Sequence, residues 1–148
     1  MARGDLTLFD EFAQQLGQED HQFESDTFKL GLINSTVPTA SDSAPSWEDY
    51  SSDEVSTSGG YTADGITLTS TFTYTGGVAT FDASDVQLSQ NGSGFTDAYW
   101  GIIYNWTQGG TIGEAIAFLD LGGPVSEQDG PVNINWNANG IFTIAVTP

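Results

Sequence analysis

The first part of the chain has the apolar spacing of one short helix. Its apolar residues lie three or four positions apart, as on one face of a helix: Leu8, Phe9, Phe12, Ala13 and Leu16. Thr7 is the expected N-cap, and Gly17 can end the helix in a left-handed conformation. A polar, acidic segment follows. The pattern predicts a helical arm and connector over residues 1–26, separate from a β-sandwich domain over residues 27–148.

From Thr27 onwards apolar and polar positions alternate with a period of two, which is typical of strands that bury one face. The expected strands lie at 27–34, 66–75, 78–83, 84–90, 95–106, 112–122 and 132–146. Segment 95–106 is apolar on both faces, which favours a central strand. About seven or eight strands at this spacing predict an all-β fold, an antiparallel β-sandwich or barrel-like domain with a short N-terminal α-helix.

Turn residues refine this picture at three places. Gly76-Gly77 separates two strand patterns and predicts a hairpin, and Asn139-Gly140 predicts a second hairpin with a type I′ turn. Residues 35–60 are rich in Ser, Pro, Asp and Gly and predict one long loop. Three residues are expected to hold this loop on the domain, with one turn of helix among them: Trp47, Tyr50 and Val55.

The charge balance excludes several kinds of partner. The chain has 20 acidic residues against Arg3 and Lys29, so its formal net charge is −18. Such a surface repels nucleic acid and anionic membranes, and neither is expected as a partner. Lys29 is expected to pair with an acid. The chain contains no cysteine, no apolar run long enough to span a bilayer and no visible signal peptide.

The acidic stretch 46–65 is the first candidate for chemistry. Read as an EF-hand from Asp49, it has Val55 at the seventh position and no glycine at the sixth, so the calcium template fits poorly. A looser calcium site is the alternative to a solvated loop, which is favoured. No cofactor or metal is expected.

Catalysis has little support from the remaining residues. His21 is the only histidine, and it is expected at the surface or in a capping role, outside the β domain. Asp120 lies among apolar neighbours and is expected to cap backbone donors at a strand end. The chain is therefore not expected to be an enzyme. The four tryptophans could form a sugar-stacking platform, but core packing is the favoured reading.

Seven short motifs occur in an order that resembles a family of small virion proteins of tailed bacteriophages, of the head decoration (cement) type. Together they cover nearly the whole chain: TLFDEFAQQLG (7–17), DTFKLGL (26–32), WEDYSSDEVSTSGGYTADG (47–65), FDASDVQLSQNG (81–92), YWGIIYN (99–105), IAFLDLGG (116–123) and GIFTIAV (140–146). The resemblance implies a structural role in the virion and gives no catalytic or binding residues.

On this resemblance the expected function is capsid decoration. The protein would sit on the capsid exterior, bind the major capsid protein and neighbouring copies of itself, and stabilise the lattice; homo-oligomers are left open. The candidate interface residues are Leu8, Phe9, Phe12, Leu16, Trp47 and Tyr50. The helix could serve as an intermolecular arm or could close its own sandwich. The alternative functions are a tail or neck component and a carbohydrate-binding module on the virion.

Overall fold

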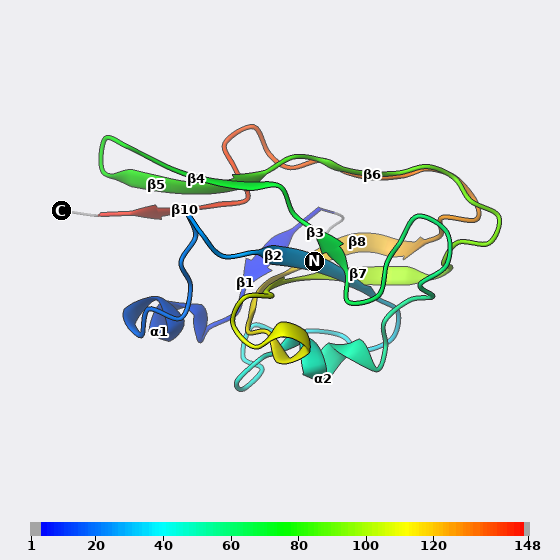
Figure 1. The fold of residues 1–148 in the computed structure, drawn as a ribbon, viewed down its shortest axis with the longest axis horizontal. Coiled ribbons are helices and arrows are strands. Elements are labelled where there is room, and N and C mark those ends of the chain that lie inside the picture. Colours follow the sequence, from blue (N-terminus) through cyan, green and yellow to red (C-terminus); the bar gives the residue numbers. More distant parts are fainter. Residues whose placement is uncertain (1–3, 147–148) are drawn as a thin grey trace.

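The structure is a computed structural model that describes residues 4–146. It is mostly β, with two short α-helices and one 3-10 turn (Figure 1). The elements in chain order are β1 (Leu6–Leu8), α1 (Phe12–Gly17), β2 (Phe28–Ile33), α2 (Trp47–Ser51), β3 (Ile66–Thr67), β4 (Ser70–Thr75), β5 (Val78–Ala83), β6 (Val86–Leu88), β7 (Ala98–Asn105), η1 (Gly110–Ile112), β8 (Ala115–Val125), β9 (Val132–Ile134) and β10 (Phe142–Ala145). This confirms the expected all-β, sandwich-like class.

Three antiparallel sheets form two β-layers. A five-stranded sheet has the order β1-β8-β7-β2-β3. The second layer holds a three-stranded sheet, β10-β5-β4, and a two-stranded sheet, β6-β9. In Figure 1 the second layer lies above the five-stranded sheet, with α1 and α2 below. None of the described helices is long and apolar enough to cross a membrane.

The five-stranded sheet is buried on both faces, as the apolar pattern of segment 95–106 predicts. β7 is its middle strand, and its last five residues, 101–105, are all buried. One face contributes to a large core with the second layer, including Leu30, Leu32 and Phe81. The other face packs against α2 and the long loop through a second cluster, which includes Trp47 and Tyr104. The expected positions of Trp47, Tyr50 and Val55 are confirmed, because all three are buried.

The N-terminal segment is part of this domain, contrary to the prediction of a separate arm. Residues 6–8 form β1, which pairs with β8 in the register Leu6↔Leu119. The predicted helix over 8–16 is wrong at its start, since α1 begins only at Phe12. The reason is tertiary: the edge of β8 offers backbone partners to residues that by spacing alone could also be helical. Thr7 is accordingly a strand residue and not an N-cap.

The two hairpin predictions have different outcomes. Gly76 and Gly77 both have positive φ and join β4 to β5, with Thr75 paired to Val78, so this hairpin is confirmed. The hairpin at Asn139-Gly140 is wrong. A local turn does form there, with the Gly140 N–H donating to the Asn137 carbonyl at 2.8 Å. The flanking strands do not pair with each other, because β9 pairs with β6 and β10 with β5.

Candidate functional site

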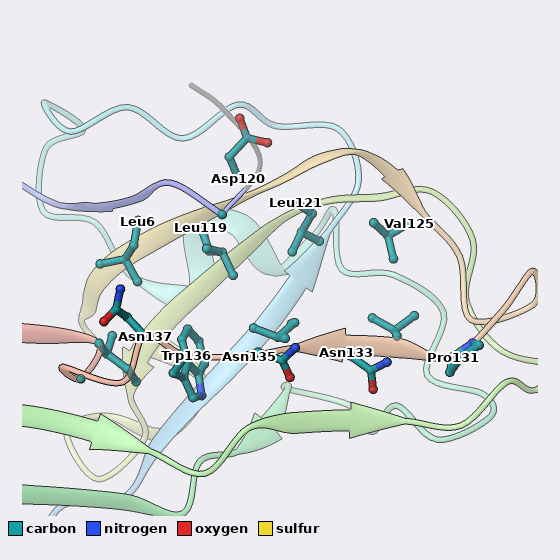
Figure 2. A pocket seen from close by; sticks show the side chains of 15 residues that line it. Leu6, Leu119, Asp120, Leu121, Val125, Pro131, Asn133, Asn135, Trp136 and Asn137 are labelled. Atoms are coloured by element: carbon teal, nitrogen blue, oxygen red, sulfur yellow. The ribbon is translucent and has the colours of Figure 1, made fainter.

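A groove of about 450 Å³ lies between β8 and the segment that contains β9 (Figure 2). Figure 2 shows Leu119 and Leu121 pointing from β8 towards this segment, whereas the Asp120 carboxylate points away. Asp120 Oδ1 accepts a hydrogen bond from the Gly122 N–H at 2.7 Å, so it binds a backbone donor as predicted, but it does so within β8 and not at a strand end. The groove is lined by Gly4, Leu6, Leu119, Asp120, Leu121, Val125, Pro131, Val132, Asn133, Ile134, Asn135, Trp136, Asn137, Gly140 and Ile141.

The chemistry of this groove suits binding through apolar surface and amide groups. Asp120 is the one titratable residue among the described residues that line it. Glycoside hydrolysis needs two carboxyl groups facing one bond, and this lining does not supply them. Asn133, Asn135 and Asn137 bring exposed side-chain amides to one wall. The groove can therefore hold a ligand, but it lacks a recognisable set of reacting groups.

The four tryptophans do not form one platform. Trp47 is fully buried and stacks on Tyr104, with the ring centroids 5.1 Å apart. Trp100 packs edge-on against Phe118 in the same cluster. Trp136 alone lines the groove. The arrangement supports the core-packing reading for Trp47 and gives the carbohydrate-binding alternative a single half-buried ring.

Lys29 does not make the expected ion pair. Its Nζ lies 3.6 Å from the centroid of the Trp106 ring, which is the geometry of a cation–π interaction. In the part of the chain that the structure describes, the contact at ion-pair distance is that of His21 Nε2 with Glu114 Oε2 at 4.0 Å, and it is ionic only when the histidine ring is protonated. Lys29 is therefore held against the ring of Trp106, the residue that follows β7.

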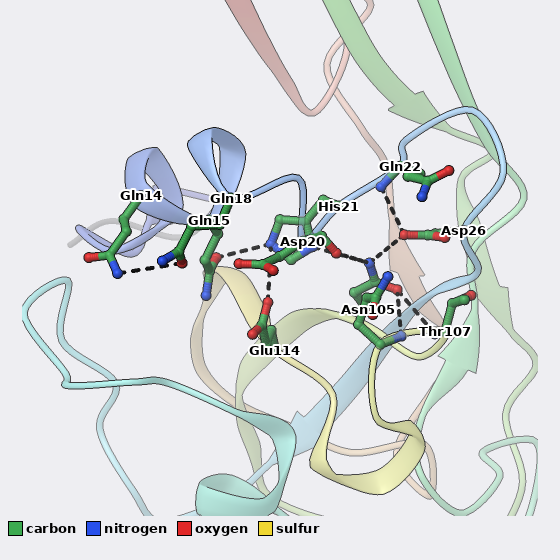
Figure 3. Close-up of polar contacts among 11 residues, drawn as sticks. Gln14, Gln15, Gln18, Asp20, His21, Gln22, Asp26, Asn105, Thr107 and Glu114 are labelled. Carbon is green, nitrogen blue, oxygen red and sulfur yellow. Dashed lines mark hydrogen bonds and ion pairs between the residues drawn. The ribbon is translucent and has the colours of Figure 1, made fainter.

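A polar cluster around His21 joins α1 to β7 (Figure 3). His21 is buried, so its predicted surface position is wrong. Its Nε2 lies 3.0 Å from Gln15 Oε1, and its Nδ1 lies 3.1 Å from Asn105 Nδ2. Because an amide nitrogen only donates, Nδ1 accepts and Nε2 carries the proton of a neutral ring. Asn105 Nδ2 also donates to Asp26 at 2.7 Å.

The environment of His21 favours the neutral ring. Burial lowers the pKa of His21, and the nearby carboxylates Asp20 and Asp26 oppose this only in part. Burial also raises the pKa of the Glu114 carboxyl, with contributions from Asp20 and Glu11. A neutral, fully hydrogen-bonded imidazole with no nucleophile beside it acts as a structural tie between α1 and β7.

The single histidine makes this state directly measurable. The imidazole signals in NMR should titrate with a midpoint below 6.5, the ordinary pKa of a histidine side chain. The unfolded chain then takes up the proton first, so stability due to neutral His21 is present above pH 6.5 and is lost as the pH falls from there towards the folded pKa. Between pH 7.5 and pH 6 the free energy of unfolding should fall more steeply in the wild type than in His21→Gln, by at most about 1.4 kcal/mol per pH unit. A midpoint above 6.5 would contradict the buried neutral ring.

The acidic stretch 46–65 acts through caps and turns. Ser46 and Asp49 form a capping box at α2, with the Ser46 N–H donating to Asp49 Oδ2 at 3.0 Å. Asp53 Oδ2 accepts from the Thr36 N–H at 3.0 Å. Glu54 Oε1 accepts from the Tyr61 hydroxyl at 2.8 Å. Within residues 4–146, no group of three or more His, Cys, Asp or Glu side chains is placed to hold a metal ion.

The candidate interface residues lie mostly inside this chain. Leu8 and Leu16 are half-buried and pack against the main core. The other four are buried, with exposed fractions of 5% or less: Phe9, Phe12, Trp47 and Tyr50. The Tyr50 hydroxyl also donates to Asp42 at 2.7 Å. Two roles are predicted for the helix, an intermolecular arm and a cover of its own domain. In the structure the helix packs on its own domain.

Glu127 is a buried charged residue that the sequence does not reveal. Its side chain is fully buried, and Oε1 accepts a hydrogen bond from the Gly60 N–H at 2.7 Å while Oε2 has no partner. A Cβ on Gly59 or Gly94 would lie 2.6 or 2.3 Å from Oε2, so glycine at both positions makes the room for this carboxylate. The acid and its glycines are far apart in the sequence, and no local pattern signals their contact.

Comparisons with protein-family models, with curated proteins and with solved structures give no match for this chain.

Proposed function

We propose that this chain is a structural virion protein that decorates the outside of a tailed-phage capsid. The observation that carries the proposal is the ordered series of seven motifs, which spans residues 7–146 and resembles small virion proteins of the decoration type. An antiparallel β domain with no recognisable set of reacting groups in its groove is compatible with this role. The partner is the major capsid protein, and binding across the seams between its subunits would stabilise the lattice.

The acidic side of α2 is the surface that we propose faces the capsid. Trp47 and Tyr50 are buried beneath the helix, and this orientation leaves Glu48 and Asp49 exposed on its outer side. A carboxylate-rich face of this kind complements a basic patch and steers the approach of such a partner. Under this proposal Trp47 and Tyr50 contribute by fixing the helix, and the charged residues make the contact.

Copy number in purified virions tests the proposal. Decoration of a lattice requires a number of copies comparable to that of the major capsid protein, because each symmetric seam repeats over the shell. Quantitative mass spectrometry of purified particles should therefore give a ratio near that of a lattice component. A few copies per particle would contradict decoration and would favour the alternative, a tail or neck component that assembles as a ring.

A further inference from the structure

One end of the sheet β10-β5-β4 carries an apolar face that residues 4–146 leave partly open. The strands pair so that Phe72, Phe81 and Phe142 lie side by side and enter the core. Two residues further along the same face the register places Tyr74, Ala79 and Ile144 together. Figure 1 shows this end projecting beyond the strands of the five-stranded sheet.

Two side chains at the projecting end are exposed although they continue a core face, and Ala79 and Ile144 beside them are half-buried. Tyr74 is 72% exposed and Val146, two residues beyond Ile144, is 81% exposed, whereas Phe81 on the same sheet is fully buried. The Val146 N–H donates to the Gly77 carbonyl at 3.2 Å, so the chain still follows β5 at this point. We call the four residues Tyr74, Ala79, Ile144 and Val146 the apolar tip.

The apolar tip lies in a part of the chain that is free of charge. Residues 66–81 and 131–146 contain no acidic or basic residue, although the whole chain carries 20 acids. These two segments supply β4, β9, β10 and most of β5. Thirteen of the 20 acids fall within residues 1–64, the part of the chain that contains β1, α1, β2, the long loop and α2. The four residues of the tip therefore come from segments without charged side chains, on a protein whose net charge is −18.

We propose that the apolar tip is the surface through which two copies of this chain associate. Two molecules of charge −18 repel each other, and contact costs least where neither copy brings a carboxylate. A two-fold contact would pack Tyr74, Ile144 and Val146 of one copy against the same residues of the other. The inference rests on the proposed function for its setting, since it names the surface by which neighbouring copies on one shell would meet.

The edges of the same sheet support association between strands as well as between faces. β4 and β10 are the two end strands of the three-stranded sheet, so each has a strand partner on one side only within the described residues. Natural proteins commonly protect such edges with charged side chains, and β4 and β10 carry none. The tip thus combines exposed apolar side chains with strand edges that a second copy can approach.

The mass of the full-length protein in solution tests this inference. Light scattering and sedimentation should show concentration-dependent association above the monomer mass of 15.7 kDa. Association should strengthen between about 0.1 M and about 1 M NaCl, since the screening length falls from ~10 Å to ~3 Å and the repulsion between acidic copies weakens.

A pair of matched variants locates the surface. Tyr74→Glu with Val146→Glu adds two charges to the tip, and Val37→Glu with Ile112→Glu adds two charges at apolar positions that are 61% and 57% exposed elsewhere. The tip variant should associate at least about tenfold more weakly than the wild type, because like charges then face each other across the contact. The control should associate at close to wild-type strength. A wild type that stays at 15.7 kDa under every condition overturns the inference, as does equal association of the two variants.

Cross-linking provides a measurement that does not depend on charged substitutions. The chain has no cysteine, so Tyr74→Cys introduces a single thiol at the tip and Val37→Cys a single thiol elsewhere. Under mild oxidation Tyr74→Cys should give a disulfide-linked dimer in much higher yield than Val37→Cys, and equal yields would contradict the tip as the contact.

Binding of the tip variant to empty shells separates the two proposals. If the tip variant loses self-association but still binds shells, the decoration proposal is retained. If virions contain few copies but the purified protein still self-associates, the proposal for the apolar tip is retained.

Discussion

Replacing Trp47 with alanine is expected to lower the free energy of unfolding by about 3–5 kcal/mol. Trp47 is fully buried and lies nearly parallel to Tyr104, with an angle of 6° between the rings. The cavity would open between α2 and the five-stranded sheet. Trp47 is one of three buried residues, with Tyr50 and Val55, that hold the loop of residues 35–60 on the domain. Urea denaturation followed by circular dichroism measures the loss.

Two further substitutions test the reason for this effect. The Trp47 indole N–H is buried without a hydrogen-bond partner, so Trp47→Phe forfeits volume but no hydrogen bond and should cost clearly less than the alanine variant. A Cβ at Gly31 would lie 2.2 Å from the Trp47 ring, so Gly31→Ala should destabilise the wild type. In the Trp47→Ala background the same change should be nearly neutral. Equal costs of Gly31→Ala in both backgrounds would show that the ring and the glycine do not contact each other.

The parts of the fold that the sequence predicts well are those in which local pattern and burial agree. The segment around β7 is apolar on both faces, and it forms the middle strand of a sheet that is covered on both sides. The helical turn at Trp47 is expected from the apolar residues that hold the long loop on the domain, and the structure adds a capping box of Ser46 and Asp49 at its start. The Gly76-Gly77 turn is found because two positive φ values require glycine there.

The parts that fail depend on contacts between distant residues. The strand at Leu6–Leu8 exists because the edge of β8 receives it, and nothing within residues 4–17 distinguishes this strand from the start of a helix. His21 is buried because Gln15 and Asn105 both meet its ring, and Asn105 is 84 positions away in the chain. The same holds for the groove, whose two walls come from β8 and the segment around β9.

The charge pattern carries information that periodicity does not. The composition alone indicates an acidic protein, and the fold shows that the acids fall unevenly on it. β4, β9 and β10 are neutral strands of the second layer, whereas the exposed side of α2 carries Glu48 and Asp49. A uniform acidic surface would indicate little beyond solubility. An uneven one gives the molecule two different faces, and the two proposals above assign a basic partner to one and a second copy to the other.

Phe12→Ala is expected to lower the free energy of unfolding by about 3–5 kcal/mol while leaving shell binding by the folded protein unchanged. Phe12 is 5% exposed and packs edge-on against Phe142, with the ring centroids 5.2 Å apart. Phe23 and His21 surround the same ring. Thermal unfolding and a binding assay with empty shells, both performed on the same preparation, measure the two effects separately.

The neighbouring residue Leu16 supplies the matched control. Leu16 lies on the same helix and is half-buried, so Leu16→Ala should cost less stability than Phe12→Ala in proportion to the smaller apolar area that it removes from contact. An intermolecular arm predicts the reverse result, a Phe12→Ala protein that melts normally and fails to bind shells. Deleting residues 1–17 would remove both the β1 pairing and the core contacts of Phe12, so a loss of shell binding by that variant would not distinguish these roles, whereas the single substitutions can.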